Sequence, residues 1–297
     1  MTPLTTRTAP STAESVRRSR RDRRRAGTAA RYLSLCAVAA VFAAPLVFMI
    51  VASFKPDARV LADGDSWRAL WPTDASLNNY GDVFARVDFT RFLLNSLLIT
   101  GAVVAGGLVV NSLAGYALAR LPWPGRRLAL TVVLALMILP FESIAIPLFA
   151  MVTEWGWRDS YQVQIVPFLA NALSVYLFYT FFLELPVELE ESARIDGAGP
   201  LRTFVRIVLP LSKPAMATVA ILSFLMQWGQ FLWPVMVTSG PEYRPLPLAI
   251  STFQTLPPLQ WGDIMAFGVM MVAPVLLVFL VFQRWFIRSV AATGLKG

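Results

Sequence analysis

The chain has 297 residues, of which 56% are hydrophobic and 15% charged, and its net charge at pH 7 is +8. Soluble domains hold about a quarter charged residues, so this composition and the positive mean hydropathy exclude that class and predict an integral membrane protein. Histidine is absent and Cys36 is the single cysteine. An internal disulfide and metal sites built from His or Cys clusters are therefore excluded, and we expect no metal.

The first 31 residues are polar and rich in Ser, Thr and Arg, without hydrophobic periodicity. We predict a disordered basic arm over residues 1–31. Most of the positive charge lies in its run over residues 17–25. An arginine cluster just before an apolar segment determines membrane topology and can contact anionic lipid, so we expect membrane lipid and no nucleic acid as its partner.

Long apolar runs predict an all-α membrane protein with six transmembrane helices, since about 20 residues cross a bilayer. The third run, residues 128–153, is interrupted only by Glu142. The other runs are free of charge and cover residues 32–54, 92–119, 160–183, 214–241 and 264–283.

Lys and Arg residues determine the predicted orientation, because cytoplasmic loops carry an excess of them. With the N-terminus inside, 19 of the 26 fall in cytoplasmic segments, and residues 55–91 hold six aspartates, which suits an external loop. We therefore predict cytoplasmic N- and C-termini. The predicted parts after the arm are a first transmembrane helix over 32–54, an external loop over 55–91, a five-helix transport core over 92–286 and a cytoplasmic tail over 287–297.

The cytoplasmic loop over residues 184–213, called the coupling loop below, carries the strongest signal in the chain. Residues 186–196 mix charged and apolar side chains as a short amphipathic helix does, and Gly197 is placed to end that helix. Gly199 and Pro200 predict the N-cap and first position of a second helix. Two short helices at an angle, between two membrane spans, make a docking surface.

Any energy from ATP would have to reach this chain through a partner protein. The chain contains no G-x-x-x-x-G-K-[ST] phosphate loop, so it lacks the usual means of binding ATP, and we expect no cofactor on the chain itself. A membrane enzyme is a weak interpretation, because no cluster of titratable residues converges within any span. The main alternative to a protein driven by a partner ATPase is an ATPase-independent secondary transporter or channel. Ion-coupled carriers usually need ionisable residues within their spans, and Glu142 is the only such residue inside a predicted span.

The coupling loop resembles the cytoplasmic motif of the inner-membrane permease subunits of binding-protein-dependent ABC importers. That motif is Glu-Ala-Ala, three residues, Gly, and an apolar stretch ending in Leu-Pro. Ser192 in place of the middle alanine is the one departure, a change between two small residues. The resemblance implies that the residues which couple to the ATPase are Glu190, Glu191, Ser192, Ala193, Asp196, Gly197, Ala198 and Pro210.

Further segments resemble the carbohydrate-uptake class of these permeases, of the six-span maltose-importer type. They are NSLLIT at residues 95–100, YALARLPWPGRR at 116–127, QFLWP at 230–234 and GLKG at the end. The resemblance implies the type I permease fold of ABC importers, in a bacterial cytoplasmic (inner) membrane. It also implies a heterodimer with a second permease subunit, a dimeric cytoplasmic ATPase and an extracytoplasmic solute-binding protein. The implied substrate is a sugar or a related polyol or oligosaccharide, moved by alternating access.

Polar and aromatic residues within the spans are candidates for the substrate pathway. Along a straight helix from Leu128, Glu142 would lie about 21 Å deep, where a carboxylate must face protein or water. Trp228 is as many residues from Pro214, the start of the fifth span, as Glu142 is from Leu128, so both would lie at a similar depth and could share a cavity. Gln230 and Phe231 follow Trp228. Aromatic faces and amides suit sugar binding. A polar tie to a neighbouring helix for Glu142, and packing for Trp228, remain the alternatives.

Overall fold

The computed structural model describes residues 12–72, 74–255 and 257–294. Every regular element within these ranges is helical, which confirms the all-α prediction. The helices, with two short 3-10 segments (η1, η2) and one π-helical turn, are α1 Thr12–Ala52, α2 Asp57–Ala62, η1 Trp67–Leu70, α3 Asn78–Arg86, α4 Phe89–Arg120, α5 Arg126–Ile138, α6 Phe141–Glu154, α7 Tyr161–Ile165, η2 Val166–Phe168, α8 Ala172–Glu184, α9 Glu188–Ile195, α10 Pro200–Thr203, the π-helical turn Phe204–Val208, α11 Leu209–Leu211, α12 Lys213–Trp228, α13 Leu232–Val237, α14 Leu246–Thr255 and α15 Trp261–Gly294.

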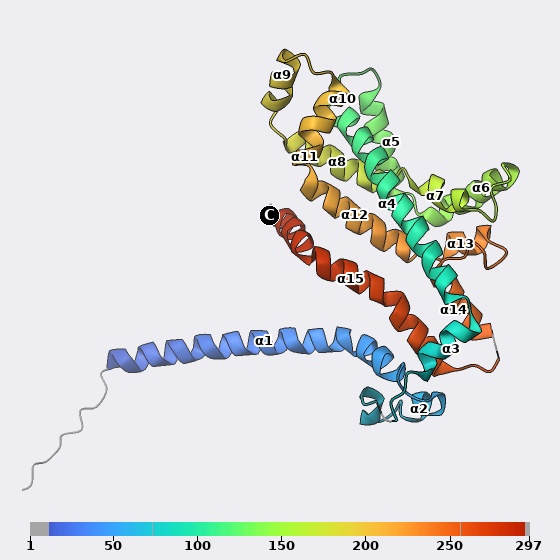
Figure 1. Ribbon diagram of the computed structural model, residues 1–297. Helices are drawn as coiled ribbons and strands as arrows, with labels where there is room; N and C mark the ends of the chain where they lie inside the picture. The colour runs from blue at the N-terminus through green and yellow to red at the C-terminus, as the bar shows by residue number, and fades with distance from the viewer. Residues whose placement is uncertain (1–11, 73, 256, 295–297) are drawn as a thin grey trace, which may run out of the picture.

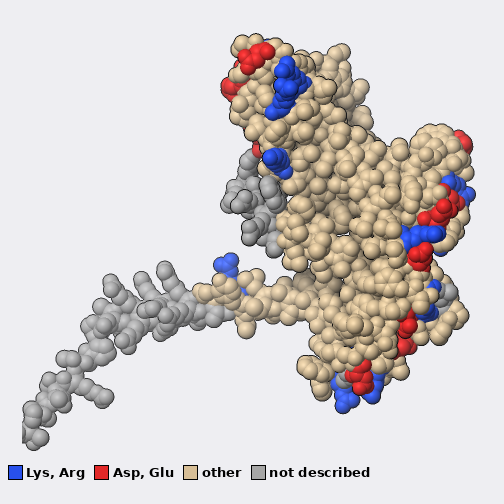
Figure 2. All heavy atoms as spheres, viewed as in Figure 1, with Lys and Arg blue, Asp and Glu red and all other residues tan. Residues whose placement is uncertain are grey.

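The helices form an elongated body with α9 and α10 at one end and α2 and α3 at the other (Figure 1). On the face shown in Figure 2, charged side chains gather toward the ends and edge of the body, and a broad stretch between them is free of charge. Among the described residues, four segments are long and apolar enough to cross a membrane: Ala30–Ala52, Phe89–Arg120, Tyr161–Glu184 and Trp261–Phe282.

Two helix pairs meet the same criterion together but are sharply bent. The angle is 105° between α5 and α6, and 79° between Pro200–Leu211 and α12. Length and composition therefore allow four spans, or up to six if each bent pair is one span. In the second pair only α12 coincides with a predicted span, because Pro200–Leu211 falls in the coupling loop.

The third predicted span is broken at Pro140. Leu139 is extended, α5 ends at Ile138, and α6 starts at Phe141 in a new direction. A proline lacks an N–H and disfavours the helical conformation of the residue before it, which explains the break. The straight-helix count that put Glu142 about 21 Å deep is therefore wrong. Glu142 instead lies exposed in the first turn of α6.

The fifth predicted span is also interrupted. Helix α12 ends at Trp228, and Gly229, Gln230 and Phe231 separate it from α13. The single helix expected over residues 214–241 is thus two helices with a short non-helical link. Spans three and five therefore both contain backbone outside a helix.

Both ends of the chain are more helical than expected. Helix α1 begins at Thr12, so the arm predicted to be disordered over 1–31 is helical from that residue on, and residues 1–11 lie outside the described residues. Arginine and alanine favour helix, and the adjoining apolar span already supplies the nucleus, so extension costs little. The predicted tail over 287–297 likewise continues α15 as far as Gly294.

The predicted external loop over 55–91 is a folded unit. Lys55 is buried, its Nζ lies 3.1 Å from Asp63 Oδ2, and it also donates to Arg68 O, as a buried cation requires. Asn79 Nδ2 donates to the carbonyls of Ser53 and Lys55. A second ion pair, 2.7 Å between Arg86 Nη1 and Asp263 Oδ2, fastens α3 to the start of α15.

Helix α4 packs along α8 and also contacts α12 and α14. Gly115 makes the approach to α8 possible, because a Cβ there would lie 2.6 Å from Phe178 Cβ and 3.0 Å from Tyr179 N. In a membrane, small residues of this kind let helices associate closely where apolar burial gives no driving force. The helix pair α4 and α8 is therefore the centre of the bundle.

We expect Gly115→Ala to lower the midpoint of thermal unfolding of the chain purified in detergent. The new Cβ would clash with backbone as well as side chain, and overpacking costs about 1–3 kcal/mol. Gly101→Ala on the same helix is the matched control, since nothing lies within 4 Å of its Cβ and alanine favours helix over glycine. Equal midpoints for the two variants would contradict the close approach of α4 and α8.

Candidate functional site

The coupling loop has the predicted helix–glycine–helix form. Helix α9 ends at Ile195, and Gly197 has a φ of +78°, the left-handed conformation that glycine adopts most readily. The N–H groups of Gly197 and Ala198 donate to Arg194 O and Ala193 O, so they satisfy carbonyls of the last helical turn. Gly199 is extended and Pro200 opens α10, as the sequence predicts.

The predicted coupling residues divide between two faces of this loop. Glu190 and Ala193 are buried, and Ala198 is half-buried. Apolar side chains add to the exposed face, with Ile195 86% and Leu201 67% exposed. The predicted residues at exposed positions are Glu191, Ser192, Asp196, Gly197 and Pro210. This mixed apolar and charged face is free to contact another protein.

The buried carboxylate of Glu190 binds two side chains of α4. Tyr116 OH donates to Oε2 at 3.2 Å, and Arg120 Nε lies 3.3 Å from Oε1. Arg120 also donates through Nη2 to Phe182 O and Leu185 O, which lie at the end of α8 where helix carbonyls lack internal partners. We call Glu190, Arg120 and Tyr116 the Glu190 cluster; it joins the ends of α4, α8 and α9.

Sequence reasoning missed two members of this cluster. From the sequence, Arg120 is a topology signal, and both Arg120 and Tyr116 are part of a segment that resembles the family, without a predicted role for either side chain. Their spacing of four residues puts both on one face of α4, at the end that leads into a loop. A signal in the sequence could have identified Tyr116 and Arg120. They are two hydrogen-bond donors on one face at the end of a span, and an acidic loop follows later in the chain.

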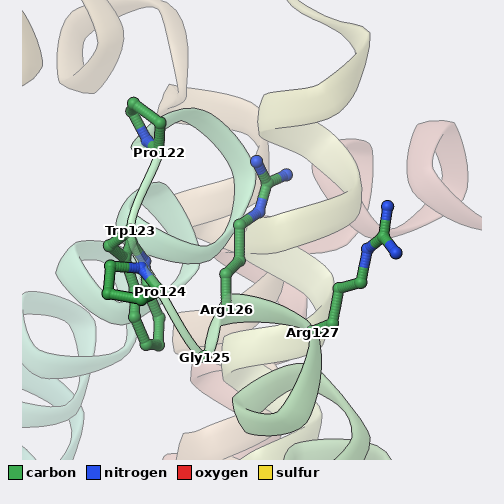
Figure 3. A pocket seen from close by; sticks show the side chains of 6 residues that line it. All are labelled: Pro122, Trp123, Pro124, Gly125, Arg126 and Arg127. Atoms are coloured by element: carbon green, nitrogen blue, oxygen red, sulfur yellow. The ribbon is translucent and has the colours of Figure 1, made fainter.

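A hollow of about 610 Å³ lies in the turn between α4 and α5 (Figure 3). Arg126 and Arg127 extend to one side of the turn, and Trp123 lies with two prolines on the other. Arg126 Nη2 donates to Ala119 O, and Trp123 Nε1 donates to Ala117 O, which fixes the turn on the end of α4. Six consecutive residues line the hollow and no second element closes it, so it is a surface feature rather than a solute cavity.

The structure does not bring Glu142 and Trp228 into contact. Trp228 is 4% exposed, stacks on Phe224 and donates from Nε1 to Met271 O at 3.1 Å, so its indole packs in the core around α15. Phe141, beside Glu142, packs in a different cluster with Trp233. Gln230 is half-buried and Phe231 is 46% exposed, at the break between α12 and α13.

Comparison with known proteins identifies the family. Residues 111–292, which include the coupling loop, match the family model described as the binding-protein-dependent transport system inner membrane component. The chain belongs to this family. It is thus the multi-pass inner-membrane permease component of an ABC importer rather than an enzyme, and such a component works with ATPase and binding-protein partners.

Several characterised relatives align over most of the chain. It is 32% identical over 254 residues to the arabinooligosaccharides transport system permease protein AraQ of Halalkalibacterium halodurans, covering 85% of this chain and 91% of AraQ. It is 33% identical over 258 residues to the trehalose/maltose transport system permease protein MalG of Thermococcus litoralis, with coverage of 85% and 91%. It is 35% identical over 224 residues to the sn-glycerol-3-phosphate transport system permease protein UgpE of Yersinia pestis, with coverage of 74% and 79%.

A solved structure supports the fold. The chain superposes with a TM-score of 0.79 on one chain in the crystal structure of a bacterial ABC transporter involved in the import of the acidic polysaccharide alginate, at 24% identity, covering 88% of this chain and 97% of the other. The permease fold predicted from the coupling motif is therefore confirmed.

At the end of the permease opposite to the coupling loop, residues 238–246 form a loop whose backbone is held by side chains of other helices. Asn95 Nδ2 donates to Glu242 O and Arg244 O, and Tyr161 OH in turn donates to Asn95 Oδ1. Gln164 Nε2 donates to Tyr243 O, and Ser96 Oγ accepts from the N–H of Leu246. This outer loop is a fixed structure, although Pro241 and Glu242 are exposed.

Asp159 fastens the start of the outer loop. Its Oδ1 accepts from Ser239 N at 2.5 Å, and its own N–H donates to Val237 O. The hydrogen bond from the Ser239 backbone lowers the pKa of Asp159 below its ordinary value of 3.8, because it stabilises the charged form. The carboxylate therefore holds the loop at neutral pH.

We expect Gly197→Ala to reduce solute uptake by the assembled importer, by up to about 5–30-fold. The left-handed conformation costs a residue with a Cβ about 1–2 kcal/mol, which corresponds to that factor in the population of the correct loop conformation. Gly199→Ala is the control, since Gly199 has a φ of −73° and neither Cβ meets an atom within 4 Å. Uptake by both variants equal to the wild type, at equal membrane content, would contradict the role of the left-handed turn.

We also expect acid to release the outer loop. The depressed pKa of Asp159 means that its contribution is complete above the unfolded-state pKa near 4 and is lost as pH falls through the lower folded-state pKa. A fluorescent label on Glu242→Cys, in a Cys36→Ser background, reports the loop's mobility during acid titration. The acid transition should be absent in the same protein with Asp159→Asn; an identical transition in both would assign it to another group.

Proposed function

We propose that this permease is one of two non-identical transmembrane subunits of an importer for a sugar, oligosaccharide or related polyol. Alternating access, driven by a dimeric cytoplasmic ATPase, moves the solute across the cytoplasmic membrane. The observation that carries the proposal is the exposed helix–glycine–helix face of the coupling loop, at one end of a membrane-spanning bundle. The cargoes named for AraQ, MalG and UgpE are all polyhydroxylated, which supports the substrate class.

The coupling face is suited to a groove on the ATPase. Exposed Ile195 and Leu201 offer apolar contact, and Glu191 and Asp196 lie on the same loop as polar anchors. A helix laid in a groove is a common docking mode for such amphipathic segments. This placement requires the coupling loop, and with it both termini, to lie on the cytoplasmic side.

The solute pathway is proposed at the two broken spans. Irregular backbone at membrane depth is tolerated where it is buried in protein or lines a water-filled cavity, and transporter sites use such breaks. Gln230 and Phe231 occupy the break after α12, and Glu142 follows the break at Pro140. Because Phe231 and Glu142 are exposed on this chain, a second permease must supply the opposite wall.

The outer loop over 238–246 is the proposed contact for the extracytoplasmic binding protein. Its backbone is fixed by the side chains of Asn95, Ser96, Asp159 and Gln164 before any partner arrives, and its exposed tip carries Pro241 and Glu242. A loop ordered in advance loses less conformational entropy on binding. A secondary transporter, which works without an ATPase or a binding protein, would have no role for the exposed face of the coupling loop or for the outer loop.

Reconstitution of the complete importer tests the proposal. The chain, purified with its partner subunits, is placed in vesicles and supplied with labelled maltose, an arabino-oligosaccharide or sn-glycerol 3-phosphate. We expect uptake of one of these classes only with ATP on the coupling-loop side and the binding protein on the other. Uptake driven by an ion gradient without ATP would contradict the ATP-driven mechanism.

Within that assay, Gln230→Ala and Phe231→Ala should slow uptake or change solute preference, and Glu142→Gln should do so more weakly. An amide and an aromatic face provide the hydrogen bonds and ring contact that a sugar needs, so their loss should change the KM for solute. Trp228→Phe should instead lower thermal stability with solute preference unchanged, because it removes a structural hydrogen bond. Leu277→Ala, at an exposed position on α15, is the control. Unchanged kinetics for Gln230→Ala and Phe231→Ala would exclude this pathway.

A further inference from the structure

We infer that Glu190 is a positioning residue which, through Arg120 and Tyr116, makes α9 and the ends of α4 and α8 move as one body. The inference rests on the proposed function, in which the ATPase moves α9. It adds the route by which that movement reaches the membrane spans. It also assigns different roles to two adjacent glutamates of the coupling loop: Glu190 positions α9, and Glu191 belongs to the docking face.

Glu190 does not belong to the docking face. Its residue is 8% exposed and its two carboxylate oxygens face two residues of α4, Tyr116 and Arg120. Glu191, the next residue, is exposed, since it lies about 100° further around α9. A carboxylate buried and paired in this way gives α9 a directional attachment to α4, which apolar packing alone would not provide.

Arg120 extends the attachment to a third helix. Its guanidinium contacts Glu190 through Nε and donates through Nη2 to two carbonyls at the end of α8, those of Phe182 and Leu185. The guanidinium donates two hydrogen bonds from Nη2 and forms an ion pair with Glu190 through Nε, without a hydrogen bond between Nε and Oε1. An ammonium group does not reach both partners in the same geometry, because it lacks the planar fork of a guanidinium. The C-terminal end of α8 carries negative partial charge, so a cation there is favourable.

Aromatic rings exclude water from the cluster and attach the second coupling helix to it. The Tyr116 ring lies 5.1 Å from that of Phe204, in the π-helical turn after α10, and 6.0 Å from that of Phe182. Phe182 and Phe204 are both buried. In such low-dielectric surroundings the ion pair is stronger than at the surface, and its separation leaves two uncompensated charges. Both coupling helices are thus fixed to the same point on α4.

The test uses the assembled importer in vesicles, with Glu190→Gln, Arg120→Lys and Tyr116→Phe made singly. The readouts are solute uptake, ATP hydrolysis, and cross-linking to the ATPase of Ser192→Cys in a Cys36→Ser background. For Glu190→Gln and Arg120→Lys we expect the number of ATP molecules hydrolysed per solute to rise about tenfold, with cross-linking retained, and for Tyr116→Phe a smaller rise. Loss of structural support alone would lower hydrolysis, uptake and cross-linking together.

A double variant examines whether the cluster acts as a unit. Glu190→Gln with Arg120→Lys should be no more uncoupled than the worse of these two single variants, since either change alone breaks the attachment. Glu154→Gln, exposed at the end of α6, and Arg127→Gln, exposed at the start of α5, are the matched charge-removal controls and should leave coupling unchanged.

Three outcomes would overturn the inference. They are multiplicative effects in the double variant, unchanged coupling in all single variants, and a parallel loss of every readout in even the mild Tyr116→Phe. Failure of the proposed function gives a different result. If Ser192→Cys does not cross-link to the ATPase in the otherwise wild-type importer, the proposed docking of the coupling loop on the ATPase is wrong. The inference about Glu190 is then wrong as well, because it depends on that docking.

Discussion

A single buried carboxylate joins the coupling loop to the membrane spans of this permease. Glu190 faces Tyr116 and Arg120 of α4, and Arg120 in turn binds the carbonyl end of α8. Removal of one partner from a buried ion pair costs about 3–5 kcal/mol, because the remaining charge stays without compensation. The cluster therefore fixes where α9 sits, and the exposed face of the coupling loop depends on that position.

Two of the predicted spans are interrupted by non-helical backbone. Pro140 ends α5, and the link from Gly229 to Phe231 follows the end of α12, so two predicted spans that are continuous apolar runs in the sequence contain non-helical backbone. Broken helices provide hydrogen-bonding groups and a change of direction within a membrane. The continuous helix α4 provides the opposite property, a straight and tightly packed axis. The permease thus combines rigid and interrupted spans, as the proposed alternating-access pathway requires.

Much of this architecture follows from local rules that the sequence displays. Gly197 and Pro200 determine a turn by their own backbone preferences, and apolar runs determine helices by their length, so both were predictable. That the helix bends at Pro140 could be predicted from the proline itself. The angle of the bend could not, because it depends on packing between Phe141 and the cluster around Trp233. The pairing of Glu190 with Arg120 joins residues 70 positions apart, and no local pattern specifies such a partner. The same holds for Lys55, whose burial depends on Asp63 and the whole folded external segment.

Helix α4 connects the two surfaces for which partner proteins are proposed. Near one end Asn95 and Ser96 hold the outer loop, and at the other end Tyr116 and Arg120 hold α9. Between them Asn111 bonds to Leu169 O and Asn171 N, at the link between η2 and α8. From Asn95 to Arg120 the helix rises about 38 Å, the thickness of the hydrocarbon core and part of the headgroup layers. A displacement of α9 therefore reaches the outer loop through one unbroken helix, with no flexible joint along the way.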